Sequence, residues 1–173
     1  SKHDHRRSYT TCITDANIKV LFDDGKVQLP KLKLVRARLS RPFFGQIKQA
    51  TVSQTPTGKY FVSVLVETEH EPLPSTDKIV GIDLGIKDLL ITSNGEKYNN
   101  KRIIKLYEDK LAREQRQLAR KVKGSNNYNK QRIKVACIHE KIYNTRIDYL
   151  HKITHKLISE NQVIVSEDLA ISD

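Results

Sequence analysis

The sequence contains no methionine or tryptophan and only two cysteines, Cys12 and Cys137, among its 173 residues. These cysteines lie far apart and form no Cys-x-x-Cys pair, which excludes a zinc ribbon within this stretch and also a disulfide framework. A reducing compartment such as the cytoplasm is therefore expected. Because residue 1 is not a methionine, we expect the chain to be part of a longer protein.

Long hydrophobic runs are missing as well. No apolar run approaches the roughly 18 residues that a membrane-spanning helix needs, and no signal-peptide pattern opens the chain. We therefore expect no membrane partner. The length of 173 residues suits one full domain or two small ones.

Charge, in contrast, is abundant and one-sided, with a formal net charge of +11. Residues 101–156 contain 16 lysines and arginines against five acidic residues, so this segment alone accounts for the whole excess. A concentrated basic surface favours a polyanion, most often a nucleic acid. A helix that is merely solvated would mix both signs, which makes that alternative the weaker one.

The first half of the chain has the pattern of short β-strands. Alternating apolar and polar residues over 17–68 are separated by turns such as Asp23-Asp24-Gly25 and Thr55-Pro56-Thr57-Gly58, which indicates a small antiparallel barrel or sandwich. The polar stretch 69–77, with two prolines, is typical of a linker. We therefore expect a β-barrel domain over residues 1–74 and a second domain over residues 75–173.

Residues 79–96, which read IVGIDLGIKDLLITSNGE, organise the second domain. Their β-branched residues predict two neighbouring strands packed on both faces, and Asn94-Gly95 predicts a tight turn. Asp83 interrupts the first strand. A buried lone carboxylate is costly, and a metal ion would remove that cost because hard cations bind carboxylate oxygens. Alternatively, Asp83 lies at a strand end that faces water.

Two long helices are expected next. The seven-residue spacing of Ile104, Leu111 and Leu118 predicts a helix over 101–123, and a Gly-Ser-Asn-Asn turn follows in which Ser125 or Asn126 can cap the second helix, over 128–159. We expect an antiparallel hairpin, residues 101–159, whose apolar rows pack on each other. The predicted row of the second helix is Ala136, Tyr143, Leu150 and Leu157, with Ile133 and Ile147 beside it.

A short β-branched strand at residues 162–166 ends directly before Glu167. In open α/β sheets, functional sites gather at the carboxyl ends of strands, so two parallel strands could bring Asp83 and Glu167 together. Side by side the two carboxylates would repel each other, and a divalent cation resolves that repulsion. Asp168 would point to the opposite face of such a strand.

Three groups of side chains have the types that hold phosphates or stack on bases. Arg6, Arg7 and Tyr9 precede the first predicted strand, and Arg36 and Arg38 share one side of the alternating segment 32–39. The third group surrounds the predicted helical turn: Arg113, Arg116, Arg120, Lys121, Lys123, Asn126, Asn127 and Tyr128.

Several of these motifs together resemble the TnpB proteins of bacterial insertion sequences, which are RNA-guided DNA endonucleases often labelled transposases. The resemblance rests on IVGIDLGIK at residues 79–87, on the turn KGSNN at 123–127 and on VIVSEDL at 163–169. The strand YFVSV at 60–64 also resembles the β-barrel "wedge" domain of that family.

The resemblance implies a RuvC-like nuclease domain with an RNase H-type fold, in which the long helical hairpin is inserted, after an N-terminal wedge-like barrel. Asp83 and Glu167 match the catalytic aspartate and glutamate, which bind two Mg²⁺ ions and hydrolyse DNA phosphodiesters. A guide RNA would select the target DNA by base pairing. The zinc ribbon and third catalytic aspartate are expected after Asp173 and a helical region before Ser1, so we expect the chain alone to be inactive.

Two other functions stay open at this stage. One is an RNA-guided DNA-binding protein that does not cut. The other is a DNA-strand transferase, which shares the two-metal chemistry but uses a DNA 3′-hydroxyl as nucleophile in place of water. For each, a bacterial cytoplasmic protein is expected.

Overall fold

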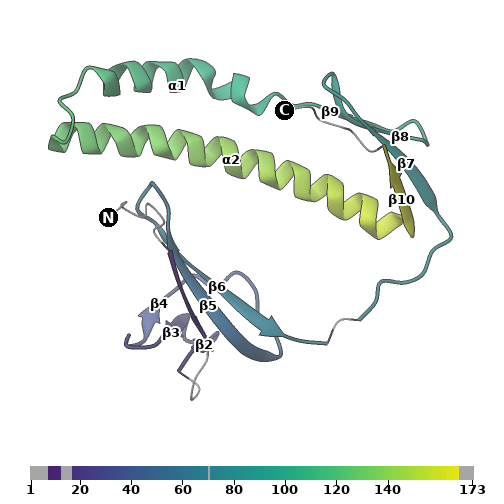
Figure 1. The fold of residues 1–173 in the computed structure, drawn as a ribbon, viewed down its shortest axis with the longest axis horizontal. Helices are drawn as coiled ribbons and strands as arrows, with labels where there is room; N and C mark the ends of the chain where they lie inside the picture. Colours follow the sequence, from purple (N-terminus) through teal and green to yellow (C-terminus); the bar gives the residue numbers. More distant parts are fainter. Residues whose placement is uncertain (1–7, 13–16, 70, 168–173) are drawn as a thin grey trace. The chain divides into compact units, whose positions relative to one another are not determined.

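A computed structural model describes residues 8–12, 17–69 and 71–167 (Figure 1). The chain divides into two compact units, Ser1–Glu71 and Pro72–Asp173. The first consists of β-strands and the second of a four-stranded sheet with two helices, so the expected mixed α+β class is confirmed. Among the described residues, no helix combines the length and apolar character required to cross a membrane.

The first unit contains two small antiparallel sheets. One has the order β1-β5-β6, from Ser8–Cys12, Gln46–Gln54 and Tyr60–Glu67. The other has the order β2-β3-β4, from Lys19–Leu21, Lys26–Gln28 and Val35–Arg36. The two predicted turns are confirmed, since each joins a pair of antiparallel strands, β2 with β3 and β5 with β6.

The two sheets pack around one core rather than closing into a barrel. Ile18, Val27 and Leu29 are buried together with Ala50 of β5. Of the predicted barrel or sandwich, a closed barrel is not formed by the described strands, because β4 has only two residues and residues 37–44 form no strand that could continue the ladder to β5. Pro42, within that stretch, cannot donate a ladder hydrogen bond.

The second unit is built on a mixed sheet with the order β10-β7-β8-β9. Its strands are β7 (Ile79–Leu84), β8 (Asp88–Thr92), β9 (Lys97–Asn99) and β10 (Val163–Ser166). β7, β8 and β9 pair antiparallel, and Gly95 has the positive φ of 84° that the predicted Asn94-Gly95 turn requires. β10 pairs parallel with β7, as predicted, although 78 residues lie between these strands.

The helical hairpin lies between β9 and β10. α1 spans Ile103–Ala119 and α2 spans Asn126–Glu160, and Figure 1 shows them side by side. Ser125 caps α2, since its Oγ accepts a hydrogen bond of 3.1 Å from the backbone N–H of Tyr128. The two helices are also joined by Gln131, whose Nε2 donates to the carbonyl oxygen and to Oε2 of Glu114, at 3.1 and 2.7 Å. The hydrogen bond from the Gln131 side chain to the Glu114 carboxylate is the main cause of the lowered pKa of Glu114.

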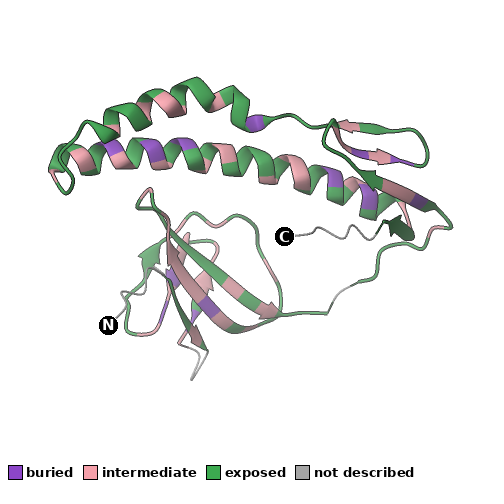
Figure 2. Cartoon of the chain, turned by 45° about the horizontal axis from the view of Figure 1, so that its top comes forward, coloured by how far each residue is buried: buried purple, intermediate pink, exposed green. Residues whose placement is uncertain are grey.

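The predicted apolar rows of the hairpin are partly wrong (Figure 2). Tyr143 is 63% exposed and Ile104 is 59% exposed, whereas Ile103 is buried. An α-helix drifts by about 20° per heptad relative to a strict seven-residue repeat, so a row drawn in steps of seven leaves the packed face. The buried residues of α2 form two groups in which the steps are three or four residues: Gln131, Val135 and Ile138 in one group, and Ile153 and Leu157 in the other.

The end of α2 covers one face of the sheet. Ile153 and Leu157 are buried against Leu90 of β8, and the half-buried Ile82 and Tyr98 complete this cluster. Packing on both faces, as predicted for β7, is wrong for the described residues. Ile79 is 64% exposed, and every residue of β10 is exposed.

Polar contacts also join α2 to the sheet. Lys156 Nζ lies 2.9 Å from both carboxylate oxygens of Glu96, and the hydroxyl of Tyr98 donates to Glu96 at 2.8 Å. The hydrogen bond from Lys156 lowers the pKa of Glu96, and the bond to Glu96 raises the pKa of Lys156. Tyr149 donates to the backbone carbonyl of Asn99 at 2.8 Å. These bonds set the position of α2 above the strands.

Leu157→Ala should destabilise the second unit, because it removes buried methyl groups and leaves a cavity beside Leu90 and Ile153. We expect the free energy of unfolding to fall by about 2–4 kcal/mol in urea denaturation. The matched control is Ile158→Ala, one residue further along α2, where the side chain is 49% exposed. Equal losses for both variants would contradict the assigned helix face.

Candidate functional site

The carboxyl ends of β7 and β10 lie next to each other in the sheet. The parallel register pairs Val163 with Ile79 and, at its last step, Ser166 with Ile82. Glu167 follows Ser166 and Asp83 follows Ile82, so one further step of this register would set the two carboxylates side by side. Neighbouring strands lie about 4.8 Å apart, and residues at paired positions face the same side of a sheet. Both carboxylates could therefore reach one cation.

Asp83 and Glu167 are both exposed, so the alternative of a strand end that faces water agrees with the position of Asp83. In β7, Asp83 stands opposite Ile91 of β8. Two residues before Asp83, the backbone of Gly81 forms two hydrogen bonds with Ser93, which directly follows β8. The Gly81 N–H donates to Ser93 Oγ (3.0 Å), and the Gly81 carbonyl oxygen accepts from the Ser93 N–H (2.8 Å). Among the described residues, neither carboxylate forms an ion pair or a hydrogen bond with another side chain.

The oxygen donors of Asp83 and Glu167 suit a hard cation such as Mg²⁺. A complete site normally needs more protein ligands or substrate oxygens than two carboxylates supply. Within residues 8–12, 17–69 and 71–167, no cluster of three or more His, Cys, Asp and Glu residues could hold a metal ion. The pair thus fits part of a metal site. Asp168, predicted to face the opposite side, lies outside the described residues.

The connection between the helices forms a second candidate surface, which we call the basic tip and define as residues 116–128. Between residues 115 and 139 the chain has seven lysines and arginines and no acidic residue. The first turn of the 35-residue helix α2 also has no acidic residue. Helix N-termini attract anions through their free N–H groups, so the cap of α2 adds to the positive potential here.

The predicted contact residues of this region are accessible. Arg113, Arg120 and Lys121 are exposed, and Arg116, also exposed, donates from Nε to the carbonyl oxygen of Ala112 at 3.3 Å. Arg113 lies 3.6 Å from the carboxylate of Glu114, which neutralises part of its charge. The remaining members Lys123, Asn126 and Asn127 are exposed, and Tyr128 is half-buried.

The residues of the first unit that were predicted to contact nucleic acid differ in their exposure and in whether the structure describes them. Arg36, in β4, and Arg38, just after it, are both exposed. Tyr9 is 49% exposed and lies in β1 opposite Val52, where an apolar neighbour makes sheet packing an equally good use of its ring. Arg6 and Arg7 lie outside the described residues.

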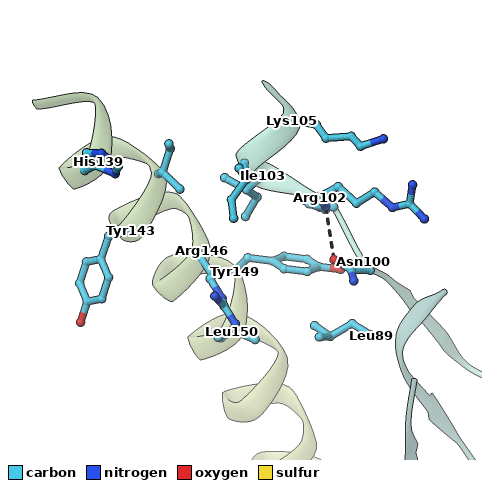
Figure 3. Close-up of a pocket in the computed structure, with 13 residues that line it drawn as sticks. Leu89, Asn100, Arg102, Ile103, Lys105, His139, Tyr143, Arg146, Tyr149 and Leu150 are labelled. Carbon is cyan, nitrogen blue, oxygen red and sulfur yellow. Dashed lines mark hydrogen bonds between the residues drawn. The ribbon is translucent and has the colours of Figure 1, made fainter. Parts of the chain in front are cut away.

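A pocket at the other end of the hairpin was not predicted. It has a volume of about 730 Å³ and lies between the start of α1 and the middle of α2 (Figure 3). Its lining includes Arg102, Lys105, Tyr143 and Arg146. The predicted seven-residue row placed Tyr143 in the packing between the helices, so a pocket beside Tyr143 was not expected. The useful signal was the spacing of Tyr143 and Arg146, which stand on one face of α2.

Comparison with known proteins places the chain among transposon proteins. A family model described as "Probable transposase" (OrfB_IS605) matches residues 61–173. The "Putative RNA-guided DNA endonuclease InsQ" of Escherichia coli (strain K12) is 40% identical over 157 residues, which are 90% of this chain and 39% of the relative. A "Putative RNA-guided DNA endonuclease" of Streptomyces pristinaespiralis is 45% identical over 121 residues, 70% of this chain and 30% of the relative.

The chain thus spans less than half the length of both relatives. The matched residues include β7, the whole helical hairpin and β10, which are the elements that carry Asp83, the basic tip and Glu167. Since the family model covers more than half of the chain, and since the relatives agree with the resemblance to TnpB proteins, the chain belongs to the OrfB_IS605 family of insertion-sequence transposases.

Proposed function

We propose that the full-length protein containing this chain is an RNA-guided DNA endonuclease that hydrolyses phosphodiesters at a Mg²⁺ site. The parallel pairing of β10 with β7 is the observation that carries this proposal, because Asp83 and Glu167 follow the last paired residues, Ile82 and Ser166. The names of both relatives support the same activity.

Asp83 and Glu167 would hold Mg²⁺ through their carboxylate oxygens. When bound, Mg²⁺ supplies a Lewis acid for the scissile phosphate and a lower pKa for the attacking water. The two carboxylates contribute negative charge at a fixed edge of the sheet, and each makes the other a better cation ligand. Because both are exposed, a phosphodiester can approach them from solvent.

The fold we propose for the second unit is the RuvC type of RNase H-like domain, with the helical hairpin as its insertion. The mixed sheet β10-β7-β8-β9 and the return of the chain through α1 and α2 support it. We further propose that residues 1–74 are the wedge-like domain and that residues 75–173 are part of the nuclease domain. A third carboxylate would come from chain outside these 173 residues.

The basic tip would hold nucleic-acid backbones, while base pairing with a guide RNA selects the target DNA. Its support is the run of cations without acidic neighbours at the end of the hairpin. Arg36 and Arg38 would add phosphate contacts in the first unit. The expected location is the bacterial cytoplasm, where transposon DNA and its transcripts are found.

The test is a cleavage assay of the full-length protein with its guide RNA, Mg²⁺ and a matching DNA duplex. Strand breaks that require both the guide and Mg²⁺ would support the proposal. Two other products have distinct meanings. Joined strands would identify a strand transferase, as the family description "Probable transposase" suggests. Stable guide-dependent binding without breaks would identify an RNA-guided binding protein.

A further inference from the structure

Strand β6 lies at the edge of the sheet β1-β5-β6, and its outer edge pairs with no other described strand (Figure 1). Its side chains are accessible, since Tyr60 is 71% exposed, Phe61 51% and Leu65 58%. Proteins usually protect such an edge with a proline, a bulge or a charge in the middle of the strand, because an open edge pairs with other strands. β6 has no proline, and its single charged residue is Glu67 at the end. The edge is therefore suited to accept a further strand.

The pairing with β5 determines which backbone groups of β6 point to the open edge. The N–H of Thr55 donates to the carbonyl oxygen of Lys59 at 2.9 Å, so Lys59 belongs to a hydrogen-bonded pair. Hydrogen-bonded and non-hydrogen-bonded pairs alternate along an antiparallel ladder. The odd-numbered residues of β6 thus bond to β5, and the even-numbered residues direct their N–H and C=O groups outward. These residues are Tyr60, Val62, Val64 and Val66.

The sequence of β6 is complementary to itself in one antiparallel register. A twofold axis perpendicular to the sheet keeps each side chain on its own face, and we place this axis at Ser63. The opposed residues of the two copies are then Lys59 with Glu67, Tyr60 with Val66, Phe61 with Leu65, and Val62 with Val64. The outward-pointing residues fall in the hydrogen-bonded pairs, which together form about eight hydrogen bonds. Opposite charges and aromatic–aliphatic pairs stabilise a sheet when they stand directly opposite each other.

The neighbouring registers lack this complementarity. A shift by two residues in one direction places Lys59 opposite Leu65, and a shift in the other direction places Phe61 opposite Glu67. Lys59 and Glu67 are both exposed. Glu67 already pairs with Lys48 of its own copy, but a carboxylate has two oxygens and can accept a second cation. The charged ends therefore select one register.

We propose that two copies of the protein associate through β6, so that their two β1-β5-β6 sheets join into one antiparallel sheet. Both copies contribute the same strand, which makes the contact isologous and closes it at a dimer. Main-chain hydrogen bonds supply the affinity and the opposed side chains supply the register. Nucleic acid does not suit this edge, because residues 60–66 contain no cation. The contact is separate from the carboxylate pair and from the basic tip.

Disulfide trapping of the full-length protein tests the register. Ser63→Cys places two thiols opposite each other in a non-hydrogen-bonded pair, whose Cα atoms lie about 4.5 Å apart, within the reach of a disulfide. We expect mild oxidation to convert most of this variant to a covalent dimer. The matched control is Ser53→Cys in β5, opposite Phe61. Three strand spacings, about 14 Å, separate its two copies, so it should cross-link no more than the parent.

Charge reversal tests the association in solution by analytical ultracentrifugation. Lys59→Glu or Glu67→Lys alone opposes like charges at both ends of the paired strands, and we expect the dimer dissociation constant to rise about tenfold. An equimolar mixture of the two variants should associate like the parent, because every opposed pair in the mixed dimer has unlike charges. This recovery separates the pairing from misfolding, since a misfolded variant would not recover a partner.

Three results would overturn the proposal. One is a full-length protein that stays monomeric at every concentration measured. Another is cross-linking of Ser63→Cys no greater than that of Ser53→Cys. The third is a mixture of the charge variants that dissociates as readily as each variant alone. Because association is measured without guide RNA or DNA, these results do not depend on the proposed nuclease function.

Discussion

Asp83→Ala in the full-length protein should abolish guided DNA cleavage while RNA binding stays close to that of the parent. The variant loses a carboxylate proposed to hold the metal, and metal-ion catalysis contributes several kcal/mol to stabilising the transition state. We therefore expect a loss of at least about a thousandfold in the cleavage rate. RNA affinity is largely set by contacts to phosphates, and those are proposed at the basic tip. Cleavage is followed on a labelled duplex and RNA binding by gel shift.

The matched control for this variant is Asp77→Ala. Asp77 is an exposed aspartate just before β7, whereas Asp83 lies near the end of the same strand. Both variants lose one exposed carboxylate, so an unspecific effect of charge would appear in both. Normal cleavage by Asp83→Ala would contradict the mechanism, and equal losses in both variants would contradict the position of the site.

Replacing Arg116, Arg120 and Lys121 together by Gln should flatten the salt dependence of nucleic-acid binding. Each phosphate contact adds about 0.7–0.9 to the slope of log affinity against log salt, so three contacts should remove about 2–3 from that slope. At low salt such a change corresponds to a loss of affinity of roughly a thousandfold. Arg113 is left intact, because Glu114 already lies 3.6 Å from it. The measurement is a salt titration of binding.

The matched control replaces Lys78, Lys87 and Lys97 by Gln. These three lysines are exposed in the sheet region of the same unit, and the change in net charge is identical. We expect their slope to stay near that of the parent. An unchanged slope in the tip variant, or an equal decrease in both variants, would show that the basic tip does not hold the phosphates.

Local signals predicted much of the second unit. Ser125 caps α2 because its hydroxyl reaches an N–H three residues later, a relation visible in the sequence. The Asn94-Gly95 turn depends on residue types that adopt a positive φ, and Gly95 does so. The parallel pairing of β7 and β10 was also predictable, because each contains a short β-branched run that is followed directly by an acidic residue, Asp83 or Glu167.

Non-local features were harder to predict. β1 is formed by polar residues, and its pairing depends on contacts with a distant strand, such as the 2.9 Å hydrogen bond between the hydroxyls of Thr10 and Thr51. The phase of α2 was misassigned because Tyr143 and Ile142 are both hydrophobic, and only packing decides which of them turns inward. The position of the pocket depends on which residues of α2 face the start of α1, so the pocket was not predicted either.

Manganese binding measured by electron paramagnetic resonance tests the central claim most directly, which is that Asp83 and Glu167 hold the same metal site. Mn²⁺ takes oxygen ligands as Mg²⁺ does, and its free-ion signal falls as it binds. The full-length protein should be compared with Asp83→Asn, Glu167→Gln and the double variant. We expect each single variant to lose most of the binding and the double variant to lose no more, because ligands of one site are not additive. Parent-like binding in either single variant, or losses that add in the double variant, would contradict the account.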